Sequence, residues 1–337
     1  MRWRGTTVAA VGAAVLSLAA GCGLGSGSST ELVVYNAQHE DLVSAMLKGF
    51  AKETGIDVTL RNGSDFELAN QIVQEGSASP ADVFLTENSP AMTLVSGKGL
   101  FVQLDDDTAA QVPAAYVSSK KDWIGFAARS TVLAYNTRSV PKADLPASIM
   151  DMADPKWKGQ VGIAPSGADF QAIVSAVVAV EGQAKAQAWL KGLEANAKIY
   201  RNNVAILSAV NSGEIGTGII YHYYWYQDQA ESGANSKNVQ LEYFGHQDPG
   251  AFLSTSGAGV LKSSKHSEDA QKLVNYLAGK KGQQALVDSN ALEYPVGNGI
   301  AANPKLKPLS ELDPPKVDIG ALNGSQVVTM MQQAGLL

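Results

Sequence analysis

The chain has 337 residues, of which 45% are hydrophobic and 17% charged, with four His and one Cys. This ordinary globular composition excludes a disordered or disulfide-stapled protein, and so few Cys and His exclude a Cys/His zinc cluster. Lys and Arg number 26 against 32 Asp and Glu, a net charge of −6, so no basic surplus exists to bind nucleic acid.

The N-terminus has the pattern of an export signal. Two arginines precede an apolar run over residues 8–20, which is too short to span a bilayer as a mature helix. Cys22 follows small residues as in a bacterial lipobox, which predicts a signal peptide over 1–21 and a lipid on Cys22. Residues 22–30 would then be a Gly/Ser-rich tether to the cell membrane. The alternative is a plain secretory signal with an incidental Cys.

Strands and helices alternate along the exported domain. The helix predicted over 40–54 has Leu42, Met46 and Phe50 on one face and Gly55 as its stop. We predict strands at 32–35, 58–60, 81–85, 132–135, 162–164, 218–220 and 259–261, and helices at 66–74, 170–180, 184–194 and 267–278.

This alternation indicates α/β architecture with parallel strands, and the length exceeds one typical core. We therefore expect two α/β lobes with the ligand in a cleft between them. Crossovers near residues 130 and 250 would make each lobe discontinuous. Lobe 1 is predicted as residues 31–130 plus about 251–295, and lobe 2 as 131–250 plus about 296–337.

Polar side chains follow four of the predicted strands, where ligands of open α/β sheets bind. They are His39, Glu87, the small-residue turn at 166–168, and the aromatic run at 221–226, which holds four of the eleven tyrosines. Each has an ordinary structural explanation when taken alone. The tyrosines can be packing residues, His39 can start a helix, and Glu87 can be a solvated turn residue.

Together these side chains suit a hard, highly charged cation. Phenolate, carboxylate and imidazole favour ferric iron, whereas Mg²⁺ and Ca²⁺ prefer carboxylates and carbonyls. Ionising one phenol at neutral pH costs roughly 4 kcal/mol, because its ordinary pKa is about 10. Two phenolates and one carboxylate would neutralise Fe³⁺, with the imidazole neutral. Four such ligands leave two octahedral positions open.

The chain resembles the bacterial ferric-ion-binding proteins, the transferrin-like substrate-binding components of iron(III) ABC transporters. The resemblance runs from about residue 31 to the C-terminus and implies a two-lobed, type II periplasmic-binding-protein fold with hinge-linked lobes. Its most specific motif is the double tyrosine followed by Trp and Tyr. The matching stretches include 34–39 (VYNAQH), 82–87 (DVFLTE), 166–168 (SGA), 223–226 (YYWY) and 257–265 (GAGVLKSSK).

The resemblance also implies roles for individual residues. The family's iron ligands fall on His39, Glu87, Tyr223 and Tyr224. The family often holds a small anion, such as phosphate, carbonate or citrate, in the open positions of the metal. The residues implied in binding that anion are Ser166, Gly167, Ala168, Asn203 and Arg129, and the turn would offer helix N-terminal amides.

Two positions depart from the family pattern. Asn88 stands where a Gln is common, and Tyr221 stands where an Asn often helps to hold the anion. The identity of the anion, and the need for one, therefore stay open. His222 is a further imidazole beside the tyrosines, and we expect it to face solvent or to support a ligand rather than to bind metal.

We expect a lipid-anchored, monomeric binding protein that captures Fe³⁺ outside the cytoplasmic membrane and delivers it to an ABC permease. It is not expected to be an enzyme. One alternative is a solute-binding protein for a small anion or organic ligand without iron. A second is an exported hydrolase, although no G-x-S-x-G, HExxH or paired-carboxylate motif is present.

Overall fold

A computed structural model describes residues 31–337. The predicted signal peptide, the lipidation site Cys22 and the tether lie outside these residues. Within the described part of the chain, no helix is both long enough and apolar enough to span a membrane.

The strands form one continuous path with the order β2-β1-β3-β9-β4-β7-β5-β6, and β8 and β10 pair with β4 beside it. β1 is parallel to β2 and β3, and β5 is parallel to β6 and β7, as the alternating pattern predicts. The strands are β1 (Glu31–Asn36), β2 (Asp57–Asn62), β3 (Val83–Leu85), β4 (Ile124–Asn136), β5 (Val161–Ile163), β6 (Ala197–Ile199), β7 (Thr217–Tyr221), β8 (Val239–Glu242), β9 (Leu253–Val260) and β10 (Tyr294–Pro295).

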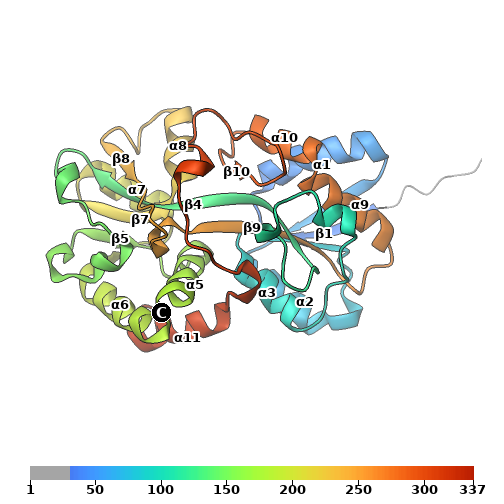
Figure 1. Cartoon of the computed structure of the whole chain (residues 1–337), viewed down its shortest axis with the longest axis horizontal. Coiled ribbons are helices and arrows are strands. Elements are labelled where there is room, and N and C mark those ends of the chain that lie inside the picture. Colours follow the sequence, from blue (N-terminus) through green and yellow to red (C-terminus); the bar gives the residue numbers. More distant parts are fainter. Residues whose placement is uncertain (1–30) are drawn as a thin grey trace, which may run out of the picture.

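Helices pack around both ends of this sheet and make two lobes (Figure 1). The first lobe holds α1 (Glu40–Thr54), α2 (Asp65–Glu75), α3 (Ser89–Gly97), α4 (Asp106–Ala109), α9 (Ser267–Ala278) and α10 (Lys280–Asp288). The second holds α5 (Ala168–Glu181), α6 (Gln183–Asn196), α7 (Asn203–Ser212), α8 (His222–Glu231) and α11 (Gly324–Ala334). α1 ends where expected, because Gly55 adopts the left-handed conformation with φ 72°.

β4 joins the lobes and is buried along its whole length. Its first half pairs with β9 up to Ser130, and its second half pairs with β7 from Thr131 onward. Figure 1 shows it running across the middle of the molecule. The apolar cores divide at the same place, since Ala128 packs in the first-lobe core and Val132 in the second. A strand shared in this way can act as a hinge between lobes.

Apolar side chains of the segment after β10 pack in both cores. Val296, Leu306 and Leu312 pack in the first-lobe core. Val327 and Met331 of α11 pack in the second-lobe core. We therefore propose a final crossing near residue 320 rather than at about 296.

Candidate metal centre

The first lobe places His39 and Glu87 at the carboxyl ends of adjacent strands. His39 follows β1 as the N-cap of α1, and Glu87 follows β3 in the loop to α3. Asp65 fixes this loop, because its two oxygens accept the backbone N–H groups of Glu87 at 2.8 Å and Asn88 at 2.9 Å. The backbone N–H of His39 donates to Gln38 Oε1 at 2.6 Å, so both predicted ligands stand on short, hydrogen-bonded connections.

The second lobe places Tyr223 and Tyr224 in the first turn of α8, directly after β7. Their rings lie side by side with centroids 4.1 Å apart and planes inclined by 31°. Tyr223 is fully buried and Tyr224 is half-buried. Neighbours on a helix point about 100° apart, so a helix start lets both hydroxyls reach the interface between the lobes.

Three predicted ligands meet across that interface. The Tyr223 hydroxyl donates to Glu87 Oε1 at 3.1 Å and lies 3.1 Å from His39 Nε2. His39 Nε2 lies 3.5 Å from the same carboxylate oxygen. An imidazole nitrogen, a carboxylate oxygen and a phenol oxygen from two lobes therefore surround one point.

Asp169 completes this group, and the sequence reasoning missed it. Its Oδ2 accepts hydrogen bonds from the Tyr224 hydroxyl at 3.0 Å and from Asn203 Nδ2 at 2.6 Å. Its Oδ1 accepts from Asn88 Nδ2 of the first lobe at 3.1 Å. An acidic residue in the first turn of a helix is ordinarily explained by the helix dipole, so position alone gave no signal.

Of the residues predicted to hold an anion, Asn203 and Arg129 share hydrogen bonds with residues of the site, and the turn at 166–168 does not. Asn203 lies in the site, but its amide is bonded to Asp169. Arg129 is fully buried, and its guanidinium donates to the Glu87 backbone carbonyl and to Ser256 Oγ. The turn at 166–168 shares no hydrogen bond with the four predicted iron ligands.

Glu293 is a second residue that sequence reasoning missed. It is buried, and its Oε2 lies 3.2 Å from Arg129 Nη2. Its Oε1 lies 4.0 Å from His39 Nε2 and has no hydrogen-bond partner. Arg129 therefore compensates the buried charges of Glu87 and Glu293 in the first lobe.

Burial raises the pKa of both Tyr223 and Tyr224 well above the ordinary value, and the neighbouring carboxylates raise it further. Both phenols are accordingly protonated at neutral pH when no cation is present. Burial also raises the pKa of Glu87, against the lowering effect of Arg129. Burial and the charge of Glu87 raise the pKa of Asp169 to about 7.

The two histidines near the site differ in their surroundings. Burial lowers the pKa of His39, which favours the neutral imidazole that a metal requires. Burial and the charge of Arg129 lower the pKa of His222 to about 3. His222 is fully buried, accepts the backbone N–H of Ser130 at 3.1 Å and stacks on Tyr294 with centroids 4.7 Å apart. His222 therefore does not face solvent, and its ring lies edge-to-face with that of Tyr223, with centroids 6.3 Å apart.

Tyr221 also supports the site. Its hydroxyl donates to Asn88 Oδ1 and to the backbone carbonyl of Asp169, both at 3.3 Å. Asn88 is held in turn by Ser254, whose hydroxyl donates to the same oxygen at 2.6 Å. The two departures from the family pattern, Asn88 and Tyr221, therefore contact each other and Asp169.

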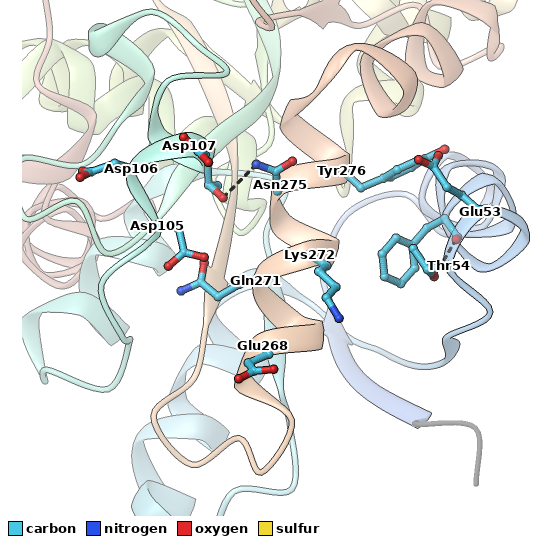
Figure 2. A pocket seen from close by; sticks show the side chains of 12 residues that line it. Glu53, Thr54, Asp105, Asp106, Asp107, Glu268, Gln271, Lys272, Asn275 and Tyr276 are labelled. Atoms are coloured by element: carbon cyan, nitrogen blue, oxygen red, sulfur yellow. Dashed lines mark hydrogen bonds between the residues drawn. The ribbon is translucent and has the colours of Figure 1, made fainter. Parts of the chain in front are cut away.

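A different pocket, of about 720 Å³, opens on the first lobe between the start of α4, with its N-cap Asp105, and helices α1 and α9. Figure 2 shows Asp105 pointing toward Gln271 of α9, whereas the side chain of Asp106 points away from that helix. The pocket contains none of the predicted ligands. The described residues contain no group of three or more His, Cys, Asp and Glu that could hold a metal ion.

Three comparisons relate the chain to known proteins. Residues 78–318 match the family model of bacterial extracellular solute-binding proteins. The chain is 56% identical over 306 residues to the Fe(3+)-binding periplasmic protein of Serratia marcescens, covering 91% of this chain and 90% of that protein.

Two solved structures have the same fold. The crystal structure of iron-bound HitA from Pseudomonas aeruginosa is 43% identical, with a TM-score of 0.86, covering 91% of this chain and all of that one. The Trichodesmium protein IdiA (FutA), in complex with iron and citrate, is 26% identical with a TM-score of 0.79, covering 91% of this chain and all of that one.

Proposed function

The chain belongs to the bacterial extracellular solute-binding proteins, and we propose that it captures Fe³⁺ outside the cytoplasmic membrane and delivers it to an ABC permease. The names of its relatives support ferric iron as the cargo. The observation that supports this proposal most directly is that His39 and Glu87 of the first lobe lie within 3.5 Å of each other and of the Tyr223 hydroxyl of the second lobe. Hard oxygen donors with one imidazole match the preferences of Fe³⁺.

We further propose five protein ligands, His39, Glu87, Asp169, Tyr223 and Tyr224. Asp169 bonds to Tyr224, so both oxygens can approach the same ion. Fe³⁺, two phenolates and Glu87 sum to zero charge, and Arg129 offsets Glu293. Asp169 brings this total to −1, and an added dianion would bring it to −3. This charge count supports iron binding without a bound synergistic anion.

Lobe closure would assemble this set. His39 and Glu87 stand on one side of the interface and the other three ligands on the other. A cation that contacts both sides favours the closed arrangement by its extra affinity for it. Release of the ion then requires the lobes to part or the phenols to regain their protons.

The location of the protein, its lipid anchor and its oligomeric state are proposed from its relatives and its sequence. The relatives are periplasmic binding proteins, which supports an extracytoplasmic protein without catalytic activity. Lipid anchoring through Cys22 rests on the lipobox-like sequence. Action as a monomer is proposed because all five ligands come from one chain.

An optical titration tests this proposal. Iron-free protein titrated with ferric citrate should develop a red to purple band, because phenolate bound to Fe³⁺ gives a visible charge-transfer transition. Trp225, beside Tyr224, should lose fluorescence in parallel. A colourless protein with unchanged fluorescence would leave the anion-binding alternative. Hydrolysis by the purified protein would favour the hydrolase alternative.

A further inference from the structure

Glu293 is held in place from both sides on the first lobe. The next residue, Tyr294, pairs with Ala128 of the shared strand β4. The preceding residue, Leu292, has a left-handed backbone with φ 53°, a conformation that a bulky side chain adopts only where the surrounding structure enforces it. The chain therefore tolerates backbone strain directly beside this carboxylate, and strain of this kind is concentrated at functional sites.

The two oxygens of the Glu293 carboxylate are used unequally. Oε2 receives two donors, Arg129 Nη2 at 3.2 Å and Gln38 Nε2 at 3.3 Å. Oε1 is buried and has no hydrogen-bond partner among the described residues, although buried acceptors are nearly always paired. A carboxylate that served only as the counter-ion of Arg129 would place both of its oxygens on donors. The bare oxygen therefore indicates a missing donor.

This bare oxygen lies beside the metal centre. It is 4.0 Å from His39 Nε2, the nitrogen that lies 3.1 Å from the Tyr223 hydroxyl and 3.5 Å from Glu87 Oε1. Donors on adjacent corners of an octahedron with bonds of about 2.1 Å are about 3 Å apart, which suits the two shorter contacts better than the longest one. A separation of 4.0 Å is too long for a hydrogen bond and suits one intervening water.

We propose that Glu293 is a specificity-determining residue that keeps the sixth coordination position of the bound ion for water. The five proposed protein ligands leave one octahedral position open, and a water there donates a hydrogen bond to Glu293 Oε1. A small anion in the same position brings a second negative charge to this oxygen, so it is disfavoured. Arg129 does not relieve the repulsion, because it is paired with Oε2. This inference rests on the proposed function, since it concerns the coordination of the captured iron.

Electron paramagnetic resonance of the iron-loaded full chain in ¹⁷O-enriched water tests for the water directly. The oxygen nucleus of a bound water broadens the signal of high-spin Fe³⁺, so the unaltered protein should show this broadening. Azide is the competing probe, because it is a small anion that carries no proton to donate. Millimolar azide should leave the broadening unchanged. Absence of broadening from the unaltered protein, or its loss on addition of azide, overturns the proposal without the use of any variant.

Glu293→Gln removes the charge and keeps the shape of the side chain. Azide should then bind to the iron at least about tenfold more tightly than in the unaltered protein. Its binding should abolish the ¹⁷O broadening and add an azide-to-iron charge-transfer band. Glu293→Asp retains the charge and should again exclude azide. Glu311→Gln, at an exposed position, is the matched control.

Removal of one partner of a buried ion pair is destabilising, so urea unfolding first establishes that Glu293→Gln is folded. If it is not, the ¹⁷O measurement on the unaltered protein decides alone. A folded Glu293→Gln protein that keeps the ferric colour and still excludes azide would refute the role of Glu293 and leave the iron function intact. Absence of ferric colour from the unaltered protein would refute the iron function itself, and this inference with it.

Discussion

The two lobes bring different chemistry to the metal centre. In the first lobe, Glu87 is already restrained by Asp65 and lies beside the buried charge of Arg129. In the second lobe, Tyr223, Tyr224 and Asp169 carry protons that a metal has to displace, since burial raises the pKa of all three. In the proposed site, the first lobe would therefore present ligands restrained by its loops, whereas the second would supply the phenols that ionise on capture.

The largest effect is expected for Tyr223→Phe and Tyr224→Phe. Each removes an anionic ligand while keeping the ring, so folding should be retained and iron affinity should fall by more than about 100-fold, beyond the range for residues that only support a ligand. Competition with a chelator and the visible band measure this. Tyr226→Phe, in the same helix but bonded to Tyr243, is the matched control. Unchanged affinity in both site variants would make the tyrosines packing residues.

Asp169→Asn tests whether the Asp169 carboxylate binds iron in place of a separate bound anion. Iron affinity in anion-free buffer should fall by about 100-fold, and added phosphate or citrate should recover part of it by occupying the freed position. The unaltered protein should be nearly indifferent to phosphate. Glu181→Gln, at the other end of α5, is the control. An unaltered protein that requires phosphate for tight binding would refute the role given to Asp169.

His39→Gln should have a smaller effect, a loss of about tenfold in iron affinity. The imidazole is a neutral donor on the partly exposed side of the site, and water can take its place. Competition with a chelator, under the conditions used for the tyrosine variants, ranks the losses of iron affinity among these variants. If His39→Gln cost more than either Tyr→Phe change, the division of roles between the lobes would be reversed.

The smallest effect concerns the stability of the iron-free protein. The pKa of Asp65 is raised to about 8 and that of Asp169 to about 7 in the folded state, mainly by burial. The folded chain therefore binds more protons than the unfolded chain, and this stabilisation is lost as pH rises. Urea unfolding should give a free energy of unfolding about 2 kcal/mol lower at pH 8 than at pH 6.5. This pH range lies above the one in which the lowered pKa values of His39 and His222 have the opposite effect. Asp169→Asn should reduce the difference, and stability rising with pH would contradict it.

Much of this architecture is predictable from the sequence because its signals are local. The apolar face of α1 and the stop at Gly55 identify that helix, and the short β-branched runs identify the strands of both lobes. His39, Glu87 and Tyr223 follow strand ends, so the topology brings them together. That these three residues bind iron, together with Tyr224 and Asp169, stays a prediction.

The parts that sequence reasoning missed depend on long-range contacts. Asp169 has the sequence context of a helix start, and only the folded chain brings it to Tyr224 and Asn88. Glu293 meets Arg129 and His39 from a distant segment. The crossing that we propose near residue 320 likewise rests on which core the apolar side chains of this segment enter.

The apparent affinity for Fe³⁺ between pH 5 and pH 8, measured against a chelator corrected for its own protonation, tests the central claim most directly. Ligands bind deprotonated, and the two phenols are protonated in the iron-free protein throughout this range. Near pH 8, the logarithm of the affinity for Fe³⁺ should fall by up to two units for each unit by which the pH is lowered, one for each phenol. The slope should steepen toward three below about pH 7, where Asp169 also holds a proton. A flat profile would contradict capture of Fe³⁺ by two phenolates of the second lobe.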